Sequence, residues 1–352
     1  MREASSFRVI RIDALALALA PSVGARTYRE HVEGFGSAAQ AFGATIHPHA
    51  QRALRAEAAR IIADGERCGA SLLLLGDPDY PAPLLHLGDP PPYLFVLGDL
   101  SVLSRPSVAI VGTRRATPYG ERVTAAIAGA LGAAGACIVS GMARGIDAAA
   151  HRAALARGGV TAAVLGTGVD VAYPVAHRTL HRTIREGGVI LSEFPCGSRA
   201  APASFPRRNR IIAALAPLTI VVEAGVKSGA LITSGHALDL GRDVAAVPGP
   251  IDSPQHVGSN ELLRNGAHLV LTAGDALSLL GLAEPSASAA IAPTLHGDER
   301  AVWLALEGGA TPIDVLTERA ALTPRRSLSA VTALELAGLV ETLPTGELRR
   351  RP

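Results

Sequence analysis

Short apolar runs alternate with amphipathic segments between residues 105 and 275, and this alternation constrains the fold more than any other feature of the chain. Nearly every run ends in glycine or a polar residue, and the runs are SVAIVG (107–112), CIVSG (137–141), TAAVLG (161–166), VILSEF (189–194), LTIVVEAG (218–225), VAAVPG (244–249) and HLVLT (268–272). Buried strands joined by amphipathic helices are typical of a parallel sheet with helices on both faces. The sequence therefore predicts an open α/β fold with right-handed connections.

The segments before and after this region have different patterns. Residues 1–75 show helical apolar spacing interrupted by Pro-Ser-Val-Gly and by glycines, which predicts a small helical domain of helix-hairpin or SAM-like type. The α/β domain then takes residues 76–282. The Pro-, Ala- and Ser-rich stretch 283–295 is expected to be a linker.

Residues 296–352 show three helical segments followed by a strand, a Pro-Thr-Gly turn and a second strand. This order is the winged-helix pattern, in which Arg325 and Arg326 would open the third, recognition-type helix. Winged helices also serve as protein-contact modules, so one basic pair leaves both roles open.

The composition is that of a folded protein without a strong overall charge. Apolar residues make up 48% of the chain and the formal net charge is +2, so a nucleic-acid surface would have to be local. No apolar run reaches the roughly 18 residues that a bilayer span needs, and we expect a cytoplasmic protein that does not contact membranes. Because Cys68, Cys137 and Cys196 stand far apart in the sequence, neither a disulfide framework nor a metal site is predicted.

Ligands of open parallel sheets bind outside the carboxyl ends of the strands. The segments that follow the predicted strands are rich in Gly, Ser, Thr and Arg, and they span residues 112–120, 140–147, 166–174, 193–210 and 223–234. Glycine-rich turns that lead into helices expose unpaired N–H groups and the positive end of the helix dipole. This combination predicts an anionic ligand.

The known nucleotide motifs do not match. A dinucleotide fingerprint would need a third glycine where GTGVDV has Val171, and a P-loop would need glycines where the chain has Val221 and Val226. We therefore expect no nucleotide cofactor.

Catalytic motifs are also missing, since the sequence contains neither G-x-S-x-G nor H-E-x-x-H. Glu193 and Glu223 follow strands and could be acids, but holding neighbouring loops through backbone N–H bonds is the better interpretation. The candidate histidines read as surface or capped residues rather than bases, and they are His151, His177 and His181. The sequence favours a binding protein over an enzyme.

The stretch SFPRRNRIIAAL (204–215) carries the sharpest hypothesis about the ligand. It predicts a helix with Pro206 near its start and an apolar stripe facing the core. Phe205 would lie at the entrance beside several arginines, where a ring can stack on an unpaired base for about 1–3 kcal/mol per base. The alternative is that Phe205 fills the core and the arginines are solvated, and the sequence alone leaves both open.

At this point the chain resembles the DNA-processing protein A family, also called DprA or Smf. The resemblance covers residues 75 to 275 and rests on motifs in the family's order, namely VAIVGTRRATPYG, IVSGMARGIDAAAHRAAL, AVLGTGVDVAYP, FPRRNRIIAAL, EAGVKSGALIT, GRDVAAVPG and GSNELLRNGAH. It implies an extended Rossmann-like domain with a helical domain before it and a winged-helix-like domain after it.

The resemblance also implies a function. Family members bind single-stranded DNA without a nucleotide cofactor, form homodimers through the Rossmann-like domain, and recruit the RecA recombinase to incoming DNA in natural transformation, displacing single-strand-binding protein. The binding residues it implies are Gly112, Thr113, Arg114, Ser140, Gly141, Phe205, Arg207, Arg208, Asn209, Arg210 and Lys227. Lys227 is the only lysine in the chain, and a compact ammonium there suits a phosphate contact.

Two other functions compete with this one. A nucleotide or nucleoside hydrolase on a related Rossmann-like fold would need a Gly-rich loop with a glutamate, where this chain has VEAGVKSGALIT. A regulator that binds duplex DNA through the winged helix is the third possibility.

Overall fold

The computed structural model describes residues 2–283, 295–306, 309–343 and 346–350, with side chains from residue 9 onward. The chain divides into two compact units, Met1–Glu284 and Pro285–Pro352. The stretch expected to be a linker lies almost entirely outside the described residues.

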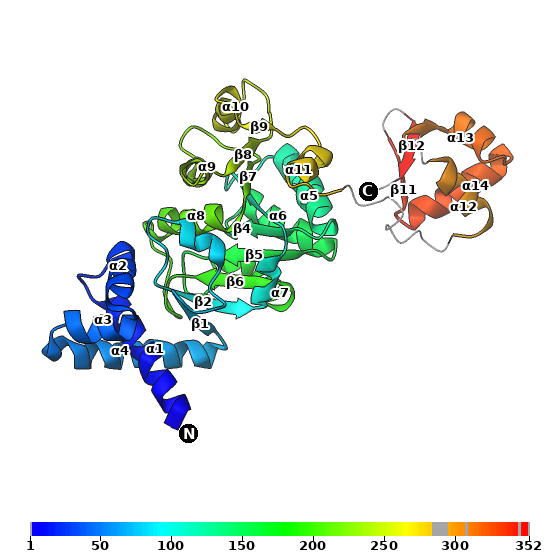
Figure 1. Ribbon diagram of the computed structural model, residues 1–352. Coiled ribbons are helices and arrows are strands. Elements are labelled where there is room, and N and C mark those ends of the chain that lie inside the picture. The colour runs from blue at the N-terminus through cyan, green and yellow to red at the C-terminus, as the bar shows by residue number, and fades with distance from the viewer. Residues whose placement is uncertain (1, 284–294, 307–308, 344–345, 351–352) are drawn as a thin grey trace. The chain divides into compact units, whose positions relative to one another are not determined.

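A nine-stranded sheet forms the centre of the first unit, in the order β1-β2-β6-β5-β4-β3-β7-β8-β9 (Figure 1). The strands from β6 to β9 in this order are parallel, while β1 and β2 add an antiparallel edge. The strands are β1 Ser71–Leu74, β2 Tyr93–Gly98, β3 Ser107–Val111, β4 Cys137–Ser140, β5 Val160–Val164, β6 Val189–Ser192, β7 Leu218–Val221, β8 Asp243–Ala246 and β9 His268–Leu269. The predicted α/β fold with a parallel sheet is confirmed.

Helices cover both faces of the sheet, and its central strands are therefore buried along their whole length. The helices of this region are α5 Pro118–Ala133, α6 Ile146–Ala156, α7 Arg178–Gly187, α8 Ser204–Leu215, α9 Gly229–Asp239, α10 Val257–Arg264 and α11 Ala273–Leu279. Helices α8 and α9 pack on the face that carries Ala109 and Val111. Helices α5, α6 and α11 pack on the opposite face, which carries Val108 and Ile110.

The short 3₁₀ helices lie in the connections of the first unit. They are η1 Ala82–His86, η2 Leu100–Ser104 and η3 Val175–His177.

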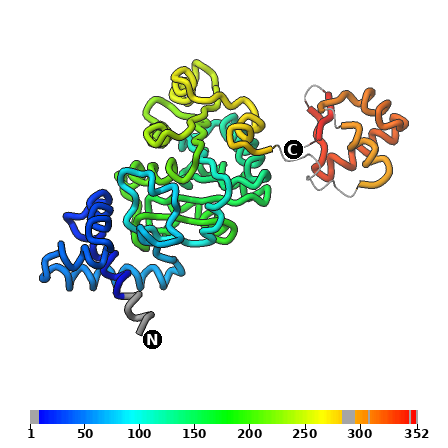
Figure 2. Tube along the Cα trace, viewed as in Figure 1, coloured from blue at the N-terminus to red at the C-terminus, as the bar shows by residue number. Residues whose placement is uncertain are grey.

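Four helices precede the sheet, and they are α1 Arg2–Leu19, α2 Ala25–Phe35, α3 Ala38–Thr45 and α4 Pro48–Cys68. Their apolar side chains do not form a separate core. Leu15, Tyr28 and Phe42 belong to one buried cluster with Phe95 of β2 and Ile190 of β6. Figure 2 traces the blue helices directly into the edge strands, so this helical segment is built onto the sheet.

The described residues of the second unit form three helices and a small sheet. Its elements are α12 Gly297–Ala305, β10 Thr311–Pro312, α13 Ile313–Arg319, α14 Pro324–Leu336, β11 Val340–Thr342 and β12 Glu347–Arg350. Strand β12 pairs antiparallel with both β10 and β11. The predicted order of three helices and a hairpin is present, with the pair Arg325–Arg326 in the first turn of α14.

A search of the described residues finds no helix with the length and apolar character needed to cross a bilayer.

Candidate nucleic-acid interface

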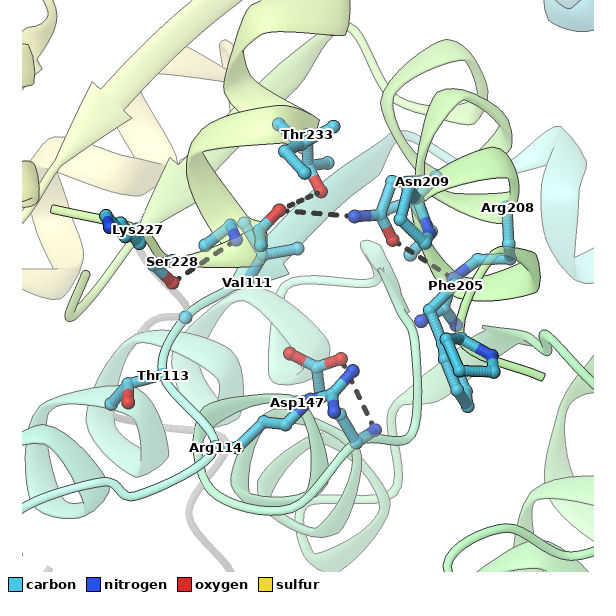
Figure 3. A pocket seen from close by; sticks show the side chains of 18 of the residues that line it. Val111, Thr113, Arg114, Asp147, Phe205, Arg208, Asn209, Lys227, Ser228 and Thr233 are labelled. Atoms are coloured by element: carbon cyan, nitrogen blue, oxygen red, sulfur yellow. Dashed lines mark hydrogen bonds between the residues drawn. The ribbon is translucent and has the colours of Figure 1, made fainter. Parts of the chain in front are cut away.

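A cavity of about 830 Å³ opens at the carboxyl ends of β3 and β7 (Figure 3). It is lined by five segments that follow strands, around residues 111–114, 143–147, 173, 200–212 and 225–233. In Figure 3 Lys227 and Ser228 lie on one side of the cavity, and Phe205 and Asn209 lie on the other. The cavity therefore forms where the strand order predicts a ligand site.

The predicted binding residues divide into two groups. Those that line the cavity are Gly112, Thr113, Arg114, Phe205, Arg208, Asn209 and Lys227. Those that do not line it are Ser140, Gly141, Arg207 and Arg210.

Phe205 is half-buried at the start of α8 and faces the cavity instead of filling the core. The guanidinium carbon of Arg114 lies 5.2 Å from the centre of the Phe205 ring, and the Tyr173 ring lies 5.4 Å from it at an angle of 32°. Arg114 and Tyr173 are exposed. A cation and two aromatic rings thus meet on one wall of the cavity.

The loop that carries Lys227 is fixed on the opposite wall. Ser228 caps α9 by accepting a hydrogen bond from the backbone N–H of Ala230 at 3.3 Å. The side-chain amide of Asn209 donates to the carbonyl oxygen of Gly229 at 3.2 Å, which joins α8 to the start of α9. Lys227 itself is exposed, so its ammonium lies on a braced loop at a helix N-terminus.

Arg208 lines the cavity, but its guanidinium is tied to the backbone. It donates to the carbonyl oxygen of Gly141 at 2.8 Å and also to that of Val164. The side chain is 4% exposed, and burial lowers the pKa of Arg208 to about 10. This arginine stabilises the floor of the site. The sequence predicted that it contacts the ligand, because the burial of a side chain cannot be read from its residue type.

Asp147 lies next to this arginine in the floor of the cavity. Its Oδ2 accepts hydrogen bonds from the backbone N–H groups of Gly141 at 3.2 Å and Ala143 at 3.3 Å. Burial raises the pKa of Asp147, and the nearby Arg208 and the two hydrogen bonds act in the opposite direction. One oxygen of this carboxylate is therefore held by the backbone of the protein itself.

Ser140 and Gly141 have structural roles. The Ser140 hydroxyl donates to the carbonyl oxygen of Ile110 at 2.6 Å, inside the sheet. A Cβ atom at Gly141 would lie 2.4 Å from the Arg208 guanidinium, so only glycine leaves room for that side chain.

The side chains of Arg207 and Arg210 form ion pairs with the carboxylate of Glu193, away from the cavity. Oε2 of Glu193 accepts from Arg207 Nε at 3.1 Å and from Arg210 at 2.9 Å. Burial raises the pKa of Glu193, and the charge of Arg210 counteracts it. Asp89 also pairs with Arg210 at 3.1 Å. These arginines fix the helix instead of facing the cavity.

Glu223 holds a loop, as its position after a predicted strand suggested. Its carboxylate is buried and accepts a hydrogen bond from the backbone N–H of Thr117 at 3.0 Å.

Tyr173 is a residue of the site that sequence reasoning missed. The signal was available, since an aromatic residue in GTGVDVAYP follows a predicted strand at the ligand edge. Its contact with Phe205 could not be inferred, because the two residues come from different loops.

The fold and the cavity define an open parallel α/β protein with a polar, cation-bearing ligand site at its strand ends, followed by a winged-helix unit. A model of the family described as DNA recombination-mediator protein A matches residues 71–281, and one of the DprA winged helix domain matches residues 285–346. The chain belongs to the DNA recombination-mediator protein A family.

Relatives with known names agree with this assignment. The chain is 45% identical over 263 residues to the putative DNA processing protein DprA of Mycobacterium tuberculosis, covering 72% of this chain and 67% of that protein. It is 38% identical over 285 residues to protein Smf of Escherichia coli, covering 77% of this chain and 75% of that one.

Two solved structures have similar folds. The DNA processing protein A of Streptococcus pneumoniae matches with a TM-score of 0.64 and 34% identity, covering 78% of this chain and 96% of that one. The Helicobacter pylori protein matches with a TM-score of 0.55 and 32% identity, covering 60% of this chain and 95% of that one. The latter structure was described for its single-stranded DNA binding mode.

Proposed function

We propose that this protein binds single-stranded DNA in the cavity between α8 and α9 and acts, without a bond-making step, as a recombination mediator that protects incoming DNA and loads RecA onto it. The observation that carries the DNA proposal is the shared wall of Arg114, Phe205 and Tyr173 opposite Lys227. Unpaired bases stack on aromatic rings, and the neighbouring cations contact the phosphates of the same strand.

The geometry supports a division of labour among these residues. Arg114 and Lys227 are exposed cations on opposite walls, so a strand that enters the cavity passes between two phosphate contacts. Arg114 covers the Phe205 ring at 5.2 Å, and it can leave the ring for a phosphate while a base takes its place. Arg208 and Asp147 keep the floor rigid during this exchange.

The relatives support the choice of ligand. The Helicobacter pylori structure concerns binding of single-stranded DNA, and the family description names a recombination mediator. The steps with RecA and single-strand-binding protein rest on the family resemblance.

Binding of a short oligo-dT, measured by fluorescence anisotropy, tests the DNA proposal. Arg114→Ala and Lys227→Ala should each weaken binding by roughly 1–2 kcal/mol and reduce the salt slope, because each removes a charge-assisted phosphate contact. Arg105→Ala is the matched control, since Arg105 is exposed and lies outside the cavity. Equal affinity of all three variants and the parent protein would contradict the proposal.

RecA loading needs its own measurement. RecA filament growth on oligo-dT coated with single-strand-binding protein should be faster in the presence of this protein, and Arg114→Ala should remove the gain. No gain with the unaltered protein would reject the mediator role while leaving the DNA site in place.

The far edge of the sheet supports the proposed homodimer. Strand β9 is the last in the sheet, and its Leu269 and the following Leu271 are exposed, as is Leu238 of α9. An exposed edge strand flanked by apolar side chains is a surface that a second copy can cover. Light scattering should report a dimer that Leu271→Arg shifts toward the monomer, and a protein that is monomeric at high concentration would contradict this proposal.

The hydrolase alternative has a direct test. Among the described residues that line the cavity, Asp147 is the carboxylate, and its Oδ2 is held by two backbone N–H groups. A hydrolase would need a carboxylate free to activate water. We expect no free base from nucleoside monophosphates incubated with the protein, and release of base would replace the binding proposal.

A further inference from the structure

Two cysteines and an aspartate that are far apart in the sequence meet in the first unit. Cys68 is the last residue of α4, Asp170 lies in the loop after β5, and Cys196 lies in the loop after β6. Their ligand atoms all lie within 4.8 Å of one another. Sequence spacing predicted no metal site, since the three residues come together only through the fold.

The geometry of this cluster suits a small tetrahedral cation. Zinc ligands at about 2.0–2.3 Å from the metal lie about 3.3–3.8 Å from one another in a tetrahedron. The Cys68 Sγ lies 3.7 Å from Asp170 Oδ2, which is already the spacing of two such ligands. Two thiols and a carboxylate supply three ligands and leave the fourth position to water.

The carboxylate is oriented before any cation arrives. The backbone N–H of Gly197 donates to Asp170 Oδ1 at 2.8 Å and to Oδ2 at 3.0 Å. Gly197 has φ +80°, a conformation that glycine adopts without strain, so the turn that aims this N–H depends on it. Within the described residues no arginine or lysine forms an ion pair with Asp170, and its charge is left for a cation.

We propose that Cys68, Asp170 and Cys196 form a binding site for a thiophilic divalent cation, with Zn²⁺ the best match to the donor set. On binding, the two thiol protons pass to solvent and two Zn–S bonds form. Asp170 supplies a Zn–O bond and one water completes the tetrahedron. No group is oxidised or reduced.

The site would brace the DNA cavity. It joins the end of α4 to the loop that carries Tyr173 and to the loop that leads into Phe205. These rings lie 5.4 Å apart on the cavity wall, so fixing both loops reduces the ordering needed when a base stacks there. This consequence, unlike the cation site itself, rests on the proposed function.

Cobalt substitution of the full chain, kept reduced, tests the site without DNA. Co²⁺ should bind once per chain, with a thiolate-to-cobalt charge-transfer band and the intense visible bands of tetrahedral cobalt, and Zn²⁺ should displace it. Cys68→Ser and Cys196→Ser should abolish the charge-transfer band or reduce it sharply. Asp170→Asn can still accept from Gly197 but loses the anionic ligand, and it should weaken Co²⁺ binding by at least about tenfold.

Cys137→Ala is the matched control, because Cys137 is buried in β4 and is not part of the cluster. It should keep the full band. The site is refuted if the parent chain shows no thiolate band, if both serine variants keep it, or if Cys68 and Cys196 form a disulfide on mild oxidation while the reduced chain takes up no Co²⁺. If the band behaves as expected and the oligo-dT affinity is the same with Zn²⁺ and with chelator, the bracing role is wrong and the cation site stands.

Discussion

Two arginines that line the same cavity, Arg114 and Arg208, differ in their exposure and in their contacts. Arg114 is exposed and its guanidinium lies over the Phe205 ring, whereas Arg208 is buried and donates to the carbonyl oxygens of Gly141 and Val164. The first is available to a ligand and the second stabilises the fold. The residue type is identical, so the difference comes from position: Arg114 lies in the exposed loop after β3, and Arg208 lies on a buried face of α8.

We therefore expect Arg208→Ala to act on stability. Removing the cation leaves Asp147 buried without its opposite charge and two carbonyl oxygens without donors, which should lower the free energy of unfolding by roughly 3–5 kcal/mol. Urea denaturation measures this loss, and Arg114→Ala, as control, should change stability by less than about 0.5 kcal/mol. A stable Arg208→Ala protein that fails to bind DNA would show instead that Arg208 contacts the ligand.

Phe205 should act on affinity. Phe205→Ala is expected to weaken oligo-dT binding by about 1–3 kcal/mol with an unchanged salt slope, because stacking is lost and no charge is removed. Phe194→Ala is the control: its ring lies under Arg207 at 5.6 Å and does not line the cavity. Equal losses in both variants would point to general destabilisation.

The sequence identified the residues of the cavity better than their roles. Phe205, Arg114 and Lys227 line the cavity, because each lies in a segment that follows a strand and these segments meet at one edge of the sheet. Arg207 and Arg210 were not separable from them, since their partner Glu193 directly follows β6, and the loop between β6 and α8 has to fold back to bring it to them. Such contacts depend on tertiary packing and leave no trace in spacing.

At the scale of elements, helix α6 contains a histidine that the fold keeps neutral. Nδ1 of His151 lies 2.6 Å from the Thr161 hydroxyl, which itself donates to the carbonyl oxygen of Ile138. Nε2 of His151 is buried and has no hydrogen-bond partner among the described residues. Burial, reinforced by the charge of Arg208, lowers the pKa of His151 to about 3.

This histidine should make the fold sensitive to acid. Below its ordinary pKa of 6.5 the unfolded chain takes up a proton at this position and the folded chain does not until about 3, so stability falls with pH in that window. The slope is about 1.4 kcal/mol per pH unit, or about 2 kcal/mol between pH 6.5 and about 5. Denaturant titrations of His151→Asn should lack this part of the loss.

The exposed His49 provides the control. His49→Asn should keep the pH dependence of the parent protein. If His151→Asn also keeps the pH dependence of the parent protein, the prediction is wrong: His151 is then protonated in the folded protein or has an ordinary pKa there.

The elements themselves were largely predictable. Each apolar run of the sequence contains a strand, because buried parallel strands need continuous apolar side chains. Strands β1 and β2 were not assigned, since their antiparallel pairing with one another and with β6 joins distant segments. The helices before them were expected as a domain, and their sharing of a core with the sheet was not visible in the sequence.

At the scale of the whole molecule, every residue that lines the cavity belongs to the first unit. In the second unit Arg326 of α14 donates to Asp298 at 2.7 Å, so one arginine of the basic pair is already neutralised. A Met1–Glu284 fragment should therefore bind oligo-dT within about twofold of the full chain. Anisotropy on both proteins measures this, and a loss greater than tenfold would assign DNA binding to the winged-helix unit.

Salt dependence reports on the complete complex. Neutralising about three to five phosphates predicts that log affinity falls against log salt with a slope of roughly −2 to −3.5. The same titration with duplex DNA separates the mediator from a duplex-binding regulator, which would favour the duplex at every salt concentration.

The cluster that unites Leu15, Tyr28 and Phe42 with Ile190 has a consequence for synthesis on the ribosome. The N-terminal helices leave the exit tunnel first, but the partner that completes their core is encoded more than a hundred codons later. At translation rates of about 5–20 residues per second, the nascent chain waits on the order of ten seconds with these side chains exposed. A chaperone that binds nascent chains should meet this protein early and release it once Ile190 has emerged.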